Sequence, residues 1–266
     1  PFLNQPFFIL RLIIYFSLWI WISKVFLNAS LMQDKSGDPL ITKHLQRKST
    51  YSLIILALTF TFASIDLIMS LTPHWYSTIF GIYIFAGAIT VLLCVATLIY
   101  MFFVKNTVLK DLVNVEHFHD LGKLTYGFNI FWSYIAFCQF FLIWYANVPE
   151  ETEFYLKHFA GSWNSVTVLL VVGHFGIPFV FFLSRMFKRN LKYHAVMLCW
   201  IISMHVLDLF WIIMPTVSPN GFTIGLSDVS IFIAMAGIYF GYFFRKINDV
   251  NLYPVKDPRL DESIKF

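Results

Sequence analysis

Long apolar runs constrain this chain more than any other feature. Seven of them follow one another, at positions 7–27, 51–71, 76–104, 124–146, 166–187, 193–214 and 229–244. About 20 largely apolar residues are enough for a helix to cross the hydrocarbon core of a bilayer. Only helices and closed barrels satisfy the backbone in lipid, and these runs exceed the roughly 10-residue strands of a barrel. We therefore predict an all-α, polytopic membrane helix bundle over residues 1–246, with about seven transmembrane helices.

Composition supports a lipid environment. Hydrophobic residues make up 58% of the 266 residues and charged residues only 13%, whereas soluble domains carry roughly 25% charged residues. The net charge of +4 does not indicate a nucleic-acid partner, because the basic residues are confined to particular loops. The three cysteines lie inside apolar runs without metal-binding spacing, so we expect no metal site in this chain.

The loops predict an orientation. Sixteen of the 19 Lys and Arg residues fall in alternate connections, around 35–48, 105–123, 185–192 and 245–265. The positive-inside rule assigns these connections to the cytoplasm. Residues 247–266 are then a cytoplasmic C-terminal tail. Six aromatic residues near the opposite ends of the runs predict an interfacial belt: Trp75, Tyr76, Trp144, Tyr145, Trp163 and Trp211.

Polar side chains within the apolar runs are the candidate functional residues, because ionisable groups are costly at bilayer depth. Counting residues from the cytoplasmic ends places Asp66, Asp208 and Gln139 at a depth of about 24 Å, and His174 and His205 at about 18–20 Å. His205 and Asp208 are three residues apart, so they share a helix face. The sequence thus predicts one polar layer drawn from several helices.

Several interpretations of this layer stay open. The polar groups could simply hold helices together. Buried carboxylates and imidazoles could instead form a proton path. A bis-histidine haem between His174 and His205 is a third and weaker alternative, and the same cavity could bind a quinone, with His and Asp as general bases.

Three further residues accompany the layer. Pro178 lies four residues after His174, so we expect it to loosen that helix and free a carbonyl group near the histidine. Arg185 is interpreted mainly as a snorkelling anchor, with a gating role as the alternative. His74 and Arg185 are accessory candidates for the site.

Four motifs carry a resemblance to a known family. The first two are residues 63–81 (ASIDLIMSLTPHWYSTIFG) and residues 139–152 (QFFLIWYANVPEET). The third is His174-Phe175 with Pro178, then Ser184-Arg185 and Lys188-Arg189-Asn190, and the fourth is Asp208 with Trp211 and Pro215. In this order they resemble the second large membrane subunit of bacterial alternative complex III, which is related to polysulfide-reductase-type membrane subunits. Leu67 departs from the pattern, which has an aromatic residue there.

The resemblance implies a subunit of a quinol oxidoreductase that delivers electrons to a cytochrome c or a terminal oxidase. It implies a bacterial inner-membrane location and partners that include a sister membrane subunit, c-type cytochrome subunits and an iron–sulfur subunit. It also implies about ten helices in two four-helix bundles, so we expect that residues precede Pro1. No haem is expected in this chain, and quinone is an optional ligand.

The function predicted from the sequence is therefore a scaffold with a proton path through Asp66, His174, His205, Asp208 and Gln139. The chain would act as an enzyme only within its complex. Quinone binding by the same subunit is the first alternative. An independent transporter is the second.

Overall fold

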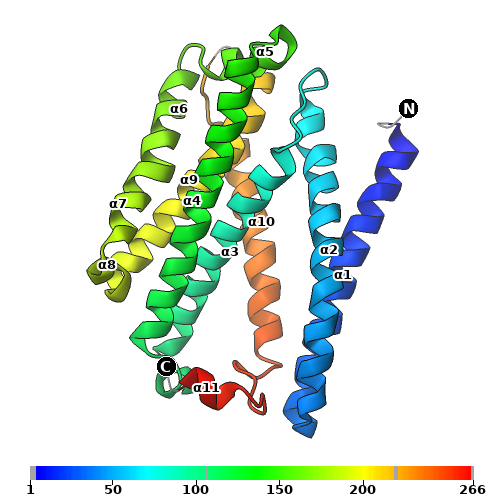
Figure 1. The fold of residues 1–266 in the computed structure, drawn as a ribbon, viewed down its shortest axis with the longest axis vertical. Helices are drawn as coiled ribbons and strands as arrows, with labels where there is room; N and C mark the ends of the chain where they lie inside the picture. The colour runs from blue at the N-terminus through cyan, green and yellow to red at the C-terminus, as the bar shows by residue number, and fades with distance from the viewer. Residues whose placement is uncertain (1–3, 106, 219–220, 265–266) are drawn as a thin grey trace. The chain divides into compact units, whose positions relative to one another are not determined.

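The chain folds into α-helices, with no strand in the part of it that the structure describes (Figure 1). The structure, a computed structural model, describes residues 4–105, 107–218 and 221–264; Pro1 and Lys265 lie outside them. Within these described residues, seven helical segments are long and apolar enough to span a membrane, which confirms the predicted all-α polytopic bundle. They are Gln5–Ser36 (α1), Pro39–Leu71 (α2 and η1), Phe80–Val104 (α3), Val115–Ala146 (α4), Trp163–Leu183 (α6, η3 and α7), Leu191–Val217 (α9) and Leu226–Ile247 (α10).

Local signals explain where the helices begin and end. Asn114 caps α4 by accepting hydrogen bonds from the backbone of Glu116 and His117. Asn147, with φ of 50°, ends α4 in the left-handed conformation, and Pro149 opens the short helix α5 (Pro149–His158). Asn190 caps α9 in the same manner as Asn114 caps α4. Several helices extend beyond the apolar runs because these caps lie in polar sequence.

The chain divides into two compact units, which are described separately. Unit 1 comprises residues 1–59 and 223–266 and contains α1, most of α2, α10 and α11 (Leu260–Ile264). Trp19 Nε1 donates to Thr59 Oγ1 at 3.0 Å, and Gln33 Nε2 donates to Thr42 Oγ1 at 2.5 Å, so polar bonds join α1 to α2. No residue of α10 is buried.

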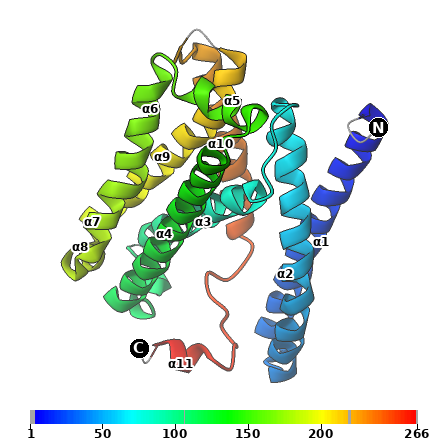
Figure 2. The same cartoon turned by 45° about the horizontal axis from the view of Figure 1, so that its top comes forward.

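Unit 2 comprises residues 60–222 and contains the candidate site. Helix α3 packs against α4 and α9, and the α6–η3–α7 segment packs beside α4 and α9 (Figures 1 and 2). One aromatic-rich cluster of buried side chains includes Phe80, Trp132 and Trp163. A second cluster includes Cys94, Phe182 and Leu198. The site lies on α3, α4, η3 and α9; the two clusters join α3, α4 and α9, and α6 and α7, which flank η3, also contribute to them.

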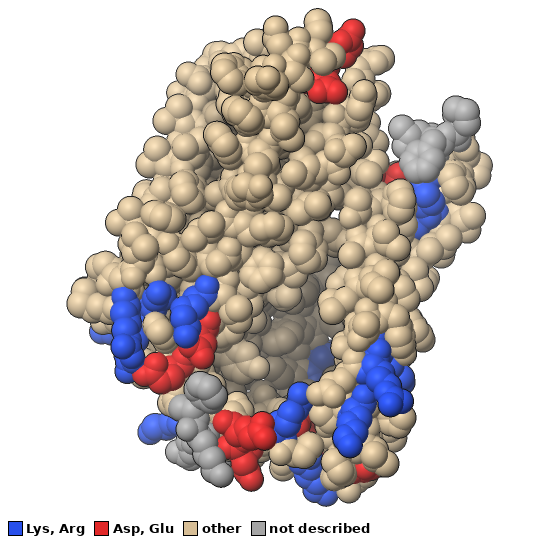
Figure 3. Space-filling view, in the orientation of Figure 1, with Lys and Arg blue, Asp and Glu red and all other residues tan. Residues whose placement is uncertain are grey.

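Charged side chains of unit 2 gather where α4 begins, beside the short helix α8 (Arg185–Arg189) (Figure 3). Arg189 pairs with Glu116, and Lys123 pairs with Asp120 at 2.5 Å. The opposite end of the unit carries Glu153, which pairs with Lys157. This distribution agrees with loops of different charge at the two ends, and the cytoplasmic assignment stays a prediction.

Candidate functional site

Three ionisable side chains converge in the core of unit 2. His174 comes from η3, a π-helical turn over Val171–Gly176, and His205 and Asp208 come from one face of α9. One nitrogen or oxygen atom from each of the three side chains lies within 4.8 Å of the others. The residues are 0%, 7% and 1% exposed, respectively. We call this group the His–His–Asp cluster, and it unites three of the five residues that the sequence predicted.

The backbone around His174 follows from Pro178. Proline has no N–H, so it cannot donate to the carbonyl group of His174 or of Gly173, one turn earlier. Side chains from two other helices replace that donor: Asn129 Nδ2 donates to the His174 carbonyl at 3.1 Å, and Trp200 Nε1 donates to the Gly173 carbonyl at 2.7 Å. The structure thus agrees with the prediction that Pro178 loosens this helix and frees a carbonyl group near His174. The helix is widened into a π turn over the six residues that precede Ile177.

The His205 ring points its Cε1 corner at Gly87 of helix α3. A Cβ atom at position 87 would lie 2.2 Å from His205 Cε1 and 2.9 Å from His205 Nδ1. Only glycine therefore leaves room for the imidazole. His205 Nδ1 lies 3.7 Å from Asp208 Oδ2, so the predicted three-residue spacing does bring the two groups together. That distance is too long for a hydrogen bond.

Asp208 receives a hydrogen bond on one side only. The Tyr83 hydroxyl donates to Asp208 Oδ1, while Oδ2 has no hydrogen-bond partner among the described residues. The indole of Trp132 is a second polar neighbour of this carboxyl group, and its ring lies 3.7 Å from the His174 ring, centre to centre. His174 Nδ1 and Nε2 and His205 Nδ1 also lack partners within the described part of the chain. Buried polar atoms without partners are rare and call for a functional or ligand-based explanation.

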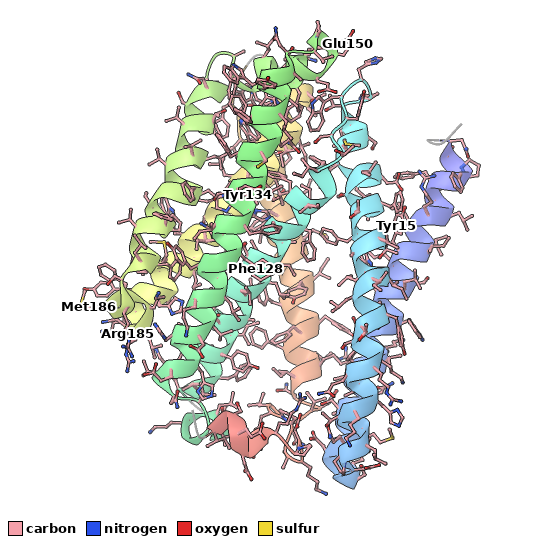
Figure 4. All side chains as sticks on the ribbon, in the orientation of Figure 1. Tyr15, Phe128, Tyr134, Glu150, Arg185 and Met186 are labelled. Carbon is pink, nitrogen blue, oxygen red and sulfur yellow. The ribbon has the colours of Figure 1, made fainter. Side chains whose placement is uncertain are left out.

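The other predicted site residues lie elsewhere. Gln139 is buried on α4, where its carbonyl oxygen accepts from Ser77 at 3.1 Å and its amide donates to the Tyr155 hydroxyl at 3.3 Å. Asp66 is also buried, at 1% exposed, on α2, but it is not part of the cluster. The two accessory candidates are exposed: His74 follows η1, and Arg185 begins α8 at the far end of the unit (Figure 4).

A cavity of about 540 Å³ lies against the cluster. Most of its wall is aromatic and aliphatic, and its polar lining residues include Asp208, Gln139, Thr167, Ser133, Tyr83 and Tyr155. Three lining residues on the outside of α4 and η3 are about 60% exposed, namely Tyr134, Phe137 and Val171. The cavity thus reaches from the apolar outer surface of these elements to the Asp208 carboxyl group. Figure 4 shows the position of Tyr134 on α4.

Sequence reasoning missed several residues of the site. Asn129 and Trp132 lie on the buried stripe of α4 that also carries the predicted Gln139, and their helical spacing from Gln139 was the only available signal. Tyr83 is one of 13 tyrosines, and nothing local distinguishes it. A further buried imidazole, His194, lies toward the other end of α9, 0% exposed and with both ring nitrogens unpartnered within the described residues. Glycine at position 122 leaves room for the His194 ring, because a Cβ atom there would lie only 3.0 Å from His194 Cε1.

Aromatic residues beside the cavity correct the predicted belt. Trp75, Trp163 and Trp211 are buried, at 4%, 1% and 9% exposed, whereas Tyr76, Trp144 and Tyr145 are exposed. Trp75 stacks on Phe154 at 4.0 Å, and the ring of His158 lies 3.9 Å from Phe154 and 4.4 Å from Trp211, all between ring centres. The belt assignment is wrong for the three buried tryptophans, because α5 covers Trp75 and Trp211, and Phe210 and Phe222 pack on Trp163.

His158 makes stability sensitive to acid. Burial lowers the pKa of His158 to about 4, although the Phe154 carbonyl 2.6 Å away favours the charged form. The unfolded chain, with an ordinary pKa near 6.5, binds this proton first. The stability contributed by neutral His158 is therefore full above about pH 6.5 and is lost as pH falls toward 4. The loss should reach about 3 kcal/mol, because the pKa falls from 6.5 in the unfolded chain to about 4 in the folded protein.

The measurement is the free energy of unfolding in detergent at pH 7 and at pH 4.5. His158→Gln should reduce the difference between the two pH values by about 2 kcal/mol. If the free energy of unfolding fell by the same amount between pH 7 and pH 4.5 in the wild type and in the variant, His158 would not be the source of the acid sensitivity.

No protein-family model matches the chain, and no curated protein matches it significantly. The geometry of unit 2 is therefore the basis for assigning a function.

Proposed function

We propose that this chain is a membrane subunit of a bacterial quinol:electron-acceptor oxidoreductase of the alternative complex III type, and that its His–His–Asp cluster transfers protons. The observation that carries the proposal is a buried group of three ionisable side chains with unpaired nitrogen and oxygen atoms. Ionisable groups at this depth mark proton and ion pathways more often than they mark helix contacts. The sequence motifs supply the class of complex.

Proton exchange in the cluster centres on two atoms. His205 Nδ1 and Asp208 Oδ2 face each other at 3.7 Å and have no other hydrogen-bond partner among the described residues. A small side-chain rotation, or one water molecule, would link them. The Tyr83 hydroxyl holds Asp208 Oδ1 and leaves Oδ2 for exchange. His174, packed on Trp132, is the second imidazole of the relay.

Buried polar residues extend the path toward both ends of unit 2. His194 precedes His205 by 11 residues, or about 16 Å along α9. Thr97, Thr125 and Asn129, all 0% exposed, are small polar side chains on α3 and α4 in the same part of the unit. On the other side, Asp208 lines the cavity together with Gln139. His194 would serve the half of the path near α8, and Gln139 the other half.

In this proposal the chain holds no redox cofactor of its own. Its partners would be the sister membrane subunit, c-type cytochrome subunits, the iron–sulfur subunit and a terminal oxidase. It would lie in the bacterial inner membrane with its C-terminus in the cytoplasm. A haem between His174 and His205 finds no support in the packing, since Asp208 and Trp132 occupy the space around the two rings.

The test is proton release per quinol oxidised by the complex in sealed vesicles. Asp208→Asn should abolish proton transfer, while electron transfer that is not coupled to proton release continues. Asp66→Asn is a second variant, which tests the buried carboxyl group outside the cluster. Glu153→Gln, at an exposed position paired with Lys157, is the matched control and should change nothing. Unchanged coupling in Asp208→Asn would leave the chain as scaffold. Purification alone or as a homo-oligomer, without red c-type cytochromes, would favour the transporter.

The cavity favours quinol binding as a second candidate function. Its aromatic walls fit a flat ring, its outer residues lie on the apolar surface of α4 and η3, and its polar end presents Asp208 and Gln139. A quinol hydroxyl could donate to the Asp208 carboxyl group. An azido-quinone should label residues of α4 or η3 if this candidate is correct. Labelling confined to other subunits would exclude it.

A further inference from the structure

We infer that His174, His205 and Asp208 also form a binding site for one divalent transition-metal ion of the zinc type. The site itself stands on geometry alone. Its consequence, that the ion blocks proton transfer, rests on the proposed function. The proposal departs from the sequence-based expectation of no metal site in the chain.

The distances between the polar atoms of the three side chains are closer to those between ligands of one metal ion than to those of hydrogen bonds. His205 Nδ1 and Asp208 Oδ2 are 3.7 Å apart. Two atoms bound to one tetrahedral zinc ion at about 2.0–2.1 Å are separated by roughly 3.3–3.4 Å. The remaining ligand distances do not exceed 4.8 Å, so inward shifts of about 1 Å would complete three bonds.

The donor set selects the class of ion. Two imidazoles and one carboxylate suit Zn²⁺ and Co²⁺, whereas Mg²⁺ and Ca²⁺ prefer oxygen ligands throughout. The atoms that would bind, on all three residues, have no hydrogen-bond partner within the described residues. One metal ion could bind all of these atoms at once, whereas no hydrogen bond within the described residues satisfies them.

The surroundings hold the ligands in place. Tyr83 donates to the Asp208 oxygen that faces away from the ion, which is the arrangement of an outer-shell partner. Gly87 lies in close contact with the Cε1 corner of the His205 ring, and the Trp132 ring packs on His174. Rigid support of this kind favours a defined coordination geometry over loose cation attraction.

Metal and protons would compete for the same lone pairs. Ligands must be deprotonated to bind, so binding releases protons and the affinity falls as the pH falls. An ion seated on His205 Nδ1 and Asp208 Oδ2 would occupy both atoms of the proposed proton exchange. Micromolar Zn²⁺ would then act as a reversible inhibitor of proton transfer.

Cobalt titration tests the site. The chain is purified without a polyhistidine tag, treated with a chelator and titrated with Co²⁺. We expect one equivalent to bind, with the visible absorption of a four- or five-coordinate ion, and Zn²⁺ but not Mg²⁺ to displace it. His174→Gln, His205→Gln and Asp208→Asn should each weaken binding by roughly 100-fold or more. His158→Gln and His119→Gln, which lie outside the cluster, should leave the titration unchanged.

One further variant guards against misfolding of the ligand variants. Tyr83→Phe keeps all three ligands and should weaken Co²⁺ binding by roughly 10- to 100-fold. Absence of a saturable cobalt spectrum in the wild-type chain, or the same spectrum in all three ligand variants, would overturn the inference. No cobalt binding combined with Asp208-dependent proton transfer would overturn the metal site alone. Cobalt binding combined with normal coupling in Asp208→Asn would overturn the proposed proton path alone.

Discussion

Alanine at position 87 should destabilise unit 2 by about 1–3 kcal/mol, the range found when a methyl group is forced into a packed core. The added Cβ would lie 2.2 Å from the His205 ring, which is well inside van der Waals contact. Helix α3 cannot retreat easily, because it packs against both α4 and α9. His205 must therefore rotate away from Asp208 or the helices must separate. Unfolding of the detergent-solubilised chain, followed by circular dichroism, measures the change.

Gly127→Ala is the matched control. Gly127 also lies inside a helix of unit 2, on α4, and a Cβ atom there would meet nothing within 4 Å. Alanine favours the helical conformation over glycine by roughly 0.5–1 kcal/mol, so this variant should be neutral or slightly more stable. If both alanine variants had the same stability, close packing of His205 on Gly87 would not be a feature of the folded protein.

The fold was predictable because a membrane leaves few choices. Apolar runs of the required length can only become helices, and the structure contains the seven that were expected. Helix ends were less predictable, since Asn114 and Asn190 extend α4 and α9 by capping them in polar sequence. The membrane belt was mispredicted because apolar patterns do not show that α5 folds back over Trp75 and Trp211.

The site was predictable only where local geometry determines it. The three-residue spacing of His205 and Asp208 and the effect of Pro178 on His174 are properties of a single helix, and both appear in the structure. The approach of His174 to α9, and of Tyr83 to Asp208, depends on which helices are neighbours. Depth along a helix places Asp66 and Asp208 at one level but says nothing about their lateral separation.

Asn129→Leu should lower the stability of unit 2 by about 1–2 kcal/mol. Leucine has the same branching and the same number of side-chain heavy atoms as asparagine, but it cannot donate to the buried His174 carbonyl. That carbonyl then loses the side-chain donor that lies 3.1 Å away in the wild type. An unsatisfied buried polar group costs about 1–3 kcal/mol. We expect the lower part of that range, because Asn129 Oδ1 itself has no partner among the described residues and its removal is favourable. Release of His174 should also weaken Co²⁺ binding.

Introducing Asn129→Leu into a Pro178→Ala variant tests whether Asn129 replaces the hydrogen bond that Pro178 removes. Alanine restores an N–H group that can donate to the His174 carbonyl one turn earlier, as in a regular helix. In that background Asn129→Leu should cost roughly 1 kcal/mol less than in the wild type, which is a coupling of the size expected for groups that share a partner. The four unfolding free energies of this double-mutant cycle measure the coupling directly. Additive effects would mean that Asn129 does not replace the hydrogen bond lost at Pro178, and that the π turn at His174 has another origin.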